Sequence, residues 1–146
     1  MRGRARRDAA AEMGQAIVEL ALLLPILVFG MIGAADVARA LAVQLAVENS
    51  ARAAAESEVM SSSPSQSAAQ TAARSELGQT PGVAPASATV TETLADGSGH
   101  ACTTSTLSAP CFVTVSVRYT FTTLVHWPGV SNTFTFDRST RLRRYL

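Results

Sequence analysis

An acidic residue, Glu19, lies inside a long apolar stretch near the N-terminus. The stretch, residues 15–35, reads QAIVELALLLPILVFGMIGAA, and Glu19 is its only charged residue. A carboxylate in a membrane helix costs roughly 2.5 kcal/mol or more at mid-helix and less near an end. A cut after Gly14 would make Gln15 the first residue and Glu19 the fifth. The amino group released on a neighbouring subunit would then neutralise Glu19 within the membrane. In the simpler alternative, Glu19 reaches headgroups from the interface.

The two cysteines, Cys102 and Cys111, lie in the segment HACTTSTLSAPC at residues 100–111. If this segment is outside the cytoplasm, a disulfide is the default expectation. It would close a short loop and stabilise the fold by roughly 2.5 kcal/mol on the chain-entropy model. The alternative is a redox or metal pair that includes His100. The spacing is not C-x-x-C and no third zinc ligand is evident, so we predict the disulfide and no metal site.

No residue pattern points to catalysis. The serines do not form G-x-S-x-G or S-x-x-K, and there is no phosphate-binding loop. All 12 basic residues are arginine, which excludes a catalytic lysine. The formal net charge of +1 argues against a general nucleic-acid binder. We therefore predict that the chain is not an enzyme, has no cofactor and acts on neither nucleic acid nor a small-molecule substrate.

The apolar stretch is long enough to cross a bilayer, because a helix over residues 15–35 rises about 31 Å. The basic leader, residues 1–14, holds four arginines before it, whereas Arg39 and Arg52 follow it sparsely. This imbalance predicts a cytoplasmic N-terminus and an external C-terminal part. A secreted protein cut near Gly33 is disfavoured, because the apolar run exceeds the usual signal core of about 7–15 residues.

The helical pattern continues beyond the span. Residues 36–60 contain no Gly or Pro and many strong helix formers, which predicts one helix over about 15–60 with an external continuation at 36–60. Two helices with an unmarked break are the alternative. The Ser/Pro segment 61–67 ends this helix, and Ser65 is a candidate cap for a short helix that ends near Leu77 and Gly78.

Strand patterns dominate the remainder of the segment 61–146. Apolar and polar residues alternate over 113–122, and alternation resumes after a Pro128–Gly129 turn signal in TFTFDRSTRLRR. A weaker, edge-like strand covers about 89–94, where Val90 and Leu94 flank Glu92 on one side. We predict an α+β, single-pass, pilin-like protein, in which a long N-terminal transmembrane helix extends into a small antiparallel sheet of three or four strands.

The segment GQAIVELALLLPILVFGMIGAADVARA, residues 14–40, resembles the N-terminus of TadE-like pseudopilins of the tight-adherence (Tad/Flp) pilus system. That family has a basic leader, a Gly before the cleavage point and a Glu at the fifth mature position. A central Leu-Pro, an acidic residue and an Arg follow. The matching residues here are Gly14, Glu19, Leu24-Pro25, Asp36 and Arg39. Leu20 stands where the family usually has Phe or Tyr, and Ala38 where it often has Gly.

The resemblance implies a minor pseudopilin that takes part in assembling or initiating a Tad/Flp pilus or a related secretion filament. It implies maturation by a prepilin peptidase, with Gly14, Gln15 and Glu19 as the processing residues. The implied partners are that peptidase, other pilins and pseudopilins, Tad inner-membrane assembly proteins and the lipid bilayer. The alternative is an uncleaved single-pass protein that anchors an extracytoplasmic binding domain.

Pro25 lies near the middle of the predicted span. It removes one backbone donor and would kink the helix near residue 21. In a pilin-like subunit such a kink would help the helix to leave the bilayer. The alternative is that the proline is simply tolerated, as it often is in membrane helices.

Overall fold

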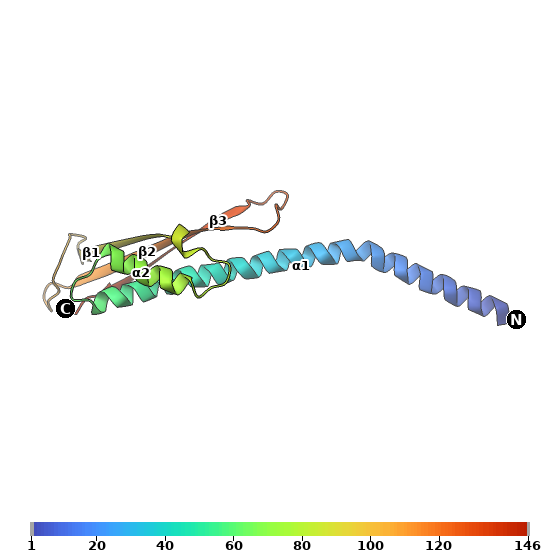
Figure 1. Cartoon of the computed structure of the whole chain (residues 1–146), viewed down its shortest axis with the longest axis horizontal. Helices are drawn as coiled ribbons and strands as arrows, with labels where there is room; N and C mark the ends of the chain where they lie inside the picture. The colour runs from blue at the N-terminus through green and yellow to red at the C-terminus, as the bar shows by residue number, and fades with distance from the viewer. Residues whose placement is uncertain (1, 146) are drawn as a thin grey trace. The chain divides into compact units, whose positions relative to one another are not determined.

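The structure, a computed structural model, describes residues 2–145 and the side chains of residues 15–145. Its elements follow one another along the chain as predicted for an α+β protein (Figure 1). They are α1 (Arg2–Met60), α2 (Gln66–Leu77), the short 3-10 helix η1 (Pro85–Ser87), β1 (Thr89–Asp96), β2 (Cys111–Thr122) and β3 (Thr133–Arg143).

The helix α1 ends where the sequence predicts and begins earlier. It ends at Met60, directly before the Ser/Pro segment, but it starts at Arg2 rather than near residue 15. The leader holds several Ala and Arg residues and no proline, which favours helix over an irregular leader. The chain forms two compact units, residues 1–38 and residues 39–146, and α1 contributes to both. We call the second unit the sheet domain.

The sheet of this domain has three antiparallel strands in the order β1-β2-β3. On the central strand, Val117 lies opposite Val90 of β1 and Arg138 of β3. On β2, buried apolar residues alternate with more exposed polar residues from Val113 to Thr122. The predicted three or four strands are therefore three, and the clearest sequence pattern belongs to the central strand.

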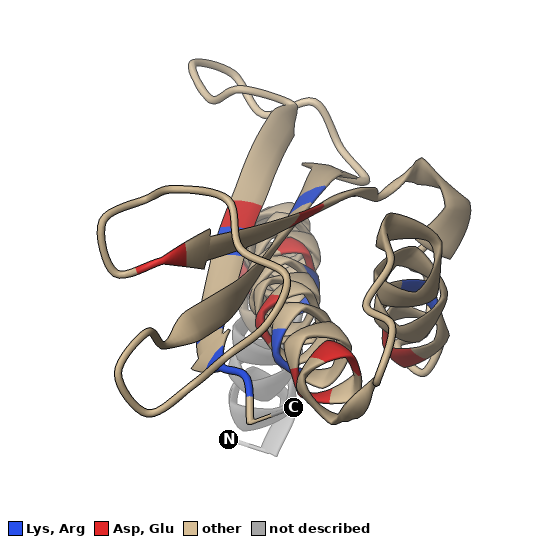
Figure 2. Cartoon of the chain, turned by 90° about the vertical axis from the view of Figure 1, so that its left-hand side faces the viewer, with Lys and Arg blue, Asp and Glu red and all other residues tan. Residues whose placement is uncertain are grey.

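The core of the sheet domain is formed by α1, α2 and one face of the sheet. On α1 the buried residues recur every three or four positions and are mostly small: Val43, Ala46, Val47, Ser50, Ala51, Ala54, Ala55 and Glu58. Alanines at these positions allow close approach of the helix, which explains how a chain with 5% aromatic residues packs a core. Figure 2 shows α2 beside the C-terminal part of α1, with the strands passing across.

The short helix α2 forms as predicted from its caps. The Ser65 side chain accepts a hydrogen bond from the Ala68 N–H at 3.3 Å, and Gly78 follows the last helical residue, Leu77. Gln66 then ties α2 to the edge strand β1. Its side-chain amide donates to the carbonyl of Val90, and its side-chain oxygen accepts from the N–H of Glu92 at 2.7 Å. This pair of bonds occupies backbone groups that an edge strand otherwise leaves open.

Candidate functional site

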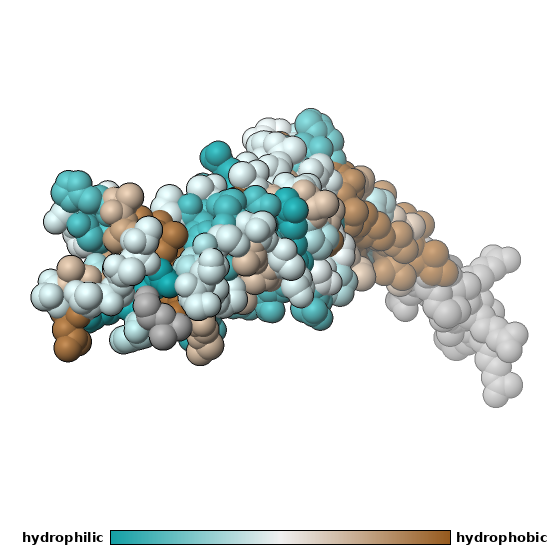
Figure 3. Space-filling view, turned by 60° about the vertical axis from the view of Figure 1, so that its left-hand side comes forward, coloured by the Kyte–Doolittle hydropathy of each residue, from teal (hydrophilic) through white to brown (hydrophobic). Residues whose placement is uncertain are grey.

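The apolar part of α1 exposes its side chains on every side. All residues from Gln15 to Met31 are exposed, and the large apolar ones among them include Ile17, Leu22, Leu27 and Phe29. Apolar exposure around a whole helix is unfavourable in water and is what lipid requires. Within the described residues, this is the one helix long and apolar enough to cross a membrane. Figure 3 shows its brown surface beside the mostly white and teal surface of the remaining described residues.

The predicted processing residues lie at the start of this apolar surface. The Gln15 side-chain amide donates to a Glu19 carboxylate oxygen at 3.1 Å, and both side chains are exposed. Gly14 lies in α1, and its surroundings fall outside the described side chains. The Glu19 carboxylate thus has a local hydrogen-bond donor on the same helix face, one turn towards the leader.

Pro25 also lies inside α1, among exposed apolar residues. Because proline has no N–H, the carbonyl of residue 21 loses its usual helical donor. Figure 1 shows that α1 bends within its blue N-terminal part. A role for this residue in extracting the helix from a bilayer stays a prediction.

Two polar residues mark the end of the apolar stretch. Asp36 is only 4% exposed, and Arg39 is half-buried. The Arg39 guanidinium lies 5.1 Å from the ring centre of Phe121, within range of a cation–π contact. Arg39 therefore fixes the first turn of α1 in the sheet domain to the end of the central strand.

The two cysteines form the predicted disulfide, with 5.9 Å between the Cα atoms of Cys102 and Cys111. We call residues 102–111 the disulfide loop. His100 lies outside it, with Nδ1 3.5 Å from a carboxylate oxygen of Asp96. The backbone N–H groups of His100 and Ser98 donate to Asp96 and lower the pKa of its carboxyl. No group of three metal-ligating side chains occurs among the described residues.

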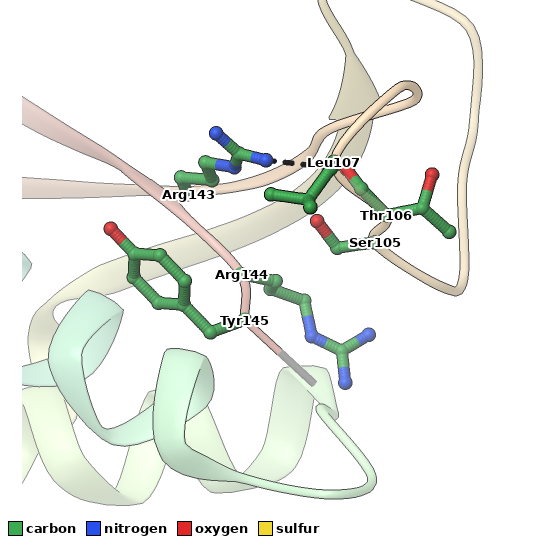
Figure 4. Close-up of a pocket in the computed structure, with 6 residues that line it drawn as sticks. All are labelled: Ser105, Thr106, Leu107, Arg143, Arg144 and Tyr145. Carbon is green, nitrogen blue, oxygen red and sulfur yellow. Dashed lines mark hydrogen bonds between the residues drawn. The ribbon is translucent and has the colours of Figure 1, made fainter.

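A shallow cleft of about 270 Å³ lies between the disulfide loop and the end of the chain (Figure 4). Ser105, Thr106 and Leu107 line one side, and residues 143–145 line the other. The Arg143 side chain donates to the Thr106 carbonyl at 3.2 Å, and Arg144 donates to the Thr103 carbonyl at 2.6 Å. These arginines hold the disulfide loop against the end of the chain.

A buried polar cluster joins three distant parts of the chain. Glu58 is 1% exposed and accepts a hydrogen bond from the Ser65 N–H at 2.7 Å. Burial raises the pKa of the Glu92 carboxyl, and the charge of Glu58 and a hydrogen bond with it raise that pKa further. The charge of Arg144 opposes this shift, and Arg144 also donates to the Ser61 carbonyl at 3.3 Å.

The sequence contained one signal for this cluster. Glu92 lies between Val90 and Leu94 on the inward side of its strand, a position that an exposed carboxylate would not take. Glu58 and Arg144 gave no such signal. An arginine-rich C-terminal segment is typical of a solvent-exposed charged strand edge, whereas Arg144 is 4% exposed and bonded within the domain.

A scan against family models matches residues 14–56 to the TadE-like protein family. The match confirms the resemblance seen in the N-terminal sequence. It begins at Gly14, covers the apolar stretch and ends within α1 of the sheet domain. Comparisons with curated proteins and with solved structures give no significant match. The matched segment includes the apolar part of the N-terminal helix, which fits a single-pass membrane protein.

Proposed function

We propose that the chain is a minor pseudopilin that takes part in the assembly or initiation of a Tad/Flp pilus or a related secretion filament. The observation that carries this proposal is the TadE-like match over residues 14–56, which includes the apolar residues 15–31 that α1 exposes on every side. The match does not extend beyond residue 56. The strands of the sheet domain therefore support the proposal only through their pilin-like arrangement. The proposed partners are other pilins and pseudopilins and the inner-membrane proteins that assemble them.

Maturation by a prepilin peptidase is the second part of the proposal. The cut after Gly14 removes the basic leader and leaves Gln15 as the new N-terminus. The leader and the span form one continuous helix, so the peptide must unwind locally to enter a protease site. Glycine lowers helix stability by roughly 1 kcal/mol relative to alanine, which favours unwinding at this position.

Glu19 has a separate role in this proposal. After cleavage, its carboxylate pairs with the free amino group of a neighbouring subunit, an attraction that little water screens. Before cleavage, the Gln15 amide donates to it at 3.1 Å and partly satisfies the charge. The residue is therefore a docking group for assembly and not a requirement for the cut.

The proposed topology places the N-terminus in the cytoplasm and the sheet domain outside. The arginines of residues 1–14 support this orientation, as does a disulfide in the sheet domain. A reporter fused after residue 146 is expected to be active only outside the cytoplasm. Activity inside the cytoplasm would contradict both the topology and the pilus role.

The processing residues are tested by substitution in a cell that makes the pilus. Gly14→Val is expected to block leader removal, because the protease site accepts only a small residue before the cut. Glu19→Ala is expected to be processed and to remain in the membrane but to support little or no pilus. Glu19→Asp is expected to assemble poorly, because its shorter side chain does not reach the amino group.

The matched control is Glu48→Ala, which removes an exposed carboxylate from the same helix within the sheet domain. It is expected to be processed and assembled like the unmodified chain. The readouts are the mass of the leader and the yield of surface pilus. If Gly14→Val and Glu19→Ala behave like the unmodified chain in both readouts, the pseudopilin proposal fails. An uncleaved membrane-anchored binding domain is then the better account.

A further inference from the structure

The loop between β2 and β3 displays apolar side chains. We call residues 123–132, TLVHWPGVSN, the hairpin loop. Leu124 is 65% exposed and Val130 is 51% exposed, and Trp127 between them is half-buried. The loop contains no Asp, Glu or Arg, in contrast to β3, which carries Asp137 and several arginines.

Backbone hydrogen bonds define the shape of this loop. The Thr123 N–H donates to the Asn132 carbonyl at 3.0 Å and closes its base. At the tip, the Val130 N–H donates to the Trp127 carbonyl at 3.2 Å, and Gly129 has φ of 79°. A proline followed by a glycine at positive φ forms a type II turn, which Pro128 and Gly129 provide. The loop thus presents Leu124 and Val130 from an ordered backbone.

The hairpin loop lies at the end of the sheet domain that also holds Arg39. The Arg39 guanidinium lies 5.1 Å from the ring of Phe121, two residues before the loop begins. At the opposite end, Arg144 bonds to the carbonyls of Ser61 and Cys111 through its side chain and its N–H. Helix residues 39–60 rise about 32 Å, and strand residues 111–121 extend by a similar length, about 33 Å. β2 and α1 therefore run antiparallel, with the disulfide loop at the far end.

Chain continuity places a membrane near the same end. The predicted span ends at Ala35, and Arg39 follows it by about 6 Å of helix rise. The headgroup layer on each side of a bilayer is about 5–7 Å deep. Residue 39 therefore lies near the outer boundary of this layer. Tryptophan favours this layer, because its ring has an apolar body and a polar N–H.

We propose that the hairpin loop contacts the headgroup layer of the bilayer that residues 15–35 cross. Leu124, Trp127 and Val130 supply the apolar contacts, and the absence of carboxylates avoids repulsion from anionic lipids. The loop forms a second attachment point of the sheet domain to the bilayer. This inference rests on the membrane span alone. It requires neither leader cleavage nor a pilus role.

Trp127 is the single tryptophan of the chain, so its fluorescence reports on the loop directly. The full chain is reconstituted in nanodiscs of phosphatidylcholine and phosphatidylglycerol, with and without spin-labelled lipid that carries the label near the headgroup. The matched control carries Trp127→Phe together with Leu107→Trp, at a disulfide-loop position that is 96% exposed. We expect Trp127 to be quenched at least about threefold more strongly than the control, since only the loop reaches the interface.

A second variant separates insertion from mere proximity. Leu124→Glu with Val130→Glu keeps Trp127 and changes only exposed side chains. Its quenching is expected to fall towards the level of the control, because carboxylates stay out of the interface of an anionic bilayer. Equal quenching of Trp127 and the control, or no effect of the two glutamates, would overturn the proposal and leave the loop to solvent or a protein partner. Co-elution of the chain with the nanodisc shows independently that the helix is inserted in the bilayer. A chain that co-elutes but shows no quenching of Trp127 would therefore contradict the loop contact and not the membrane span.

Discussion

In α1, every side chain from Gln15 to Met31 is exposed, whereas from Val43 to Glu58 a stripe on one side is buried. Both parts are helical, but the first is rich in Leu and the second in Ala. They also differ in where the apolar side chains point. In the first part they surround the helix, as lipid requires, and in the second most of them form a stripe on the side that packs on the sheet.

The comparison shows that a single helix is built for two surroundings. In the first part, large side chains such as Leu22 and Leu27 face outward. In the second part, small residues such as Ala51 and Ala54 are fully buried, and polar residues such as Arg52 and Glu56 pair on the exposed side at 2.8 Å. Residue size and pattern, together with average hydrophobicity, distinguish the membrane part from the part that packs in a domain.

The largest expected difference in membrane integration comes from replacing each of two nearly equally exposed leucines with arginine. Leu27 is 58% exposed in the first part, and Leu45 is 60% exposed in the second. Leu27→Arg is expected to abolish stable membrane integration, because an arginine near mid-helix costs about 2.5–3.5 kcal/mol. Leu45→Arg is expected to integrate normally, because its side chain enters water. Carbonate extraction measures how much of each variant stays in the membrane. Equal retention of the two variants would contradict the division of α1 into a membrane part and a part that packs on the sheet.

Loss of the disulfide is expected to act only on the sheet domain. Cys102→Ser with Cys111→Ser should lower its free energy of unfolding by about 2.5 kcal/mol, because the unfolded chain regains the entropy of an open loop. The strands are expected to remain, since the hydrogen bonds of β2 and β3 lie outside the disulfide loop. Thermal unfolding in detergent micelles gives the loss of stability, and carbonate extraction should show unchanged integration. An unfolded domain at room temperature would contradict this expectation.

The small buried residues of the second part are tested by enlargement. Ala54→Leu should destabilise the sheet domain by about 2 kcal/mol, because a fully packed site offers no space for the added carbons. Ala42→Leu is the control, since Ala42 is exposed on the same helix. Urea unfolding of both variants in micelles provides the comparison. Equal stability of the two variants would show that the α1 stripe is not closely packed.

The smallest expected effect concerns the pH dependence of the buried cluster. The pKa of Glu92 is raised above its ordinary value of 4.5, first by burial and then by Glu58. The contribution of this group to stability is therefore complete below the unfolded-state pKa and is lost as pH rises through the folded-state pKa. Glu92→Gln should raise stability at neutral pH and should flatten the fall in stability that begins as pH rises above about 4.5. Glu48→Gln, an exposed control, should do neither when unfolding is measured across this range.

Much of the fold could be predicted because its signals are local. The break after Met60, the Ser65 cap and the alternation of β2 each depend on a few neighbouring residues. The apolar stretch and Glu19 are equally visible in the sequence, and the family match covers them. The early start of α1 at Arg2 was missed because a polar leader resembles a loop in composition, although its Ala and Arg residues favour helix.

The contacts between distant segments could not be predicted in the same way. Glu58, Glu92 and Arg144 meet only because β3, which is antiparallel to β2, returns the C-terminal residues to the end of α1. The link from Gln66 to β1 likewise depends on how α2 lies against the sheet. Phe134 follows the alternating pattern yet is 39% exposed, although it pairs with the buried Phe121. The alternating pattern predicts on which face of the sheet a side chain lies. How far that side chain is buried depends on the elements that pack against the face.

The mature N-terminus tests the central claim most directly, because a cleaved pseudopilin and an uncleaved membrane anchor differ there first. The full chain is produced in membranes with and without a cognate prepilin peptidase, and the intact mass of the membrane-bound product is measured. The account predicts loss of residues 1–14 only when the peptidase is present, with Gln15 as the first residue of the product. A chain that keeps its leader in the presence of an active peptidase, or that begins at any other residue, would contradict it.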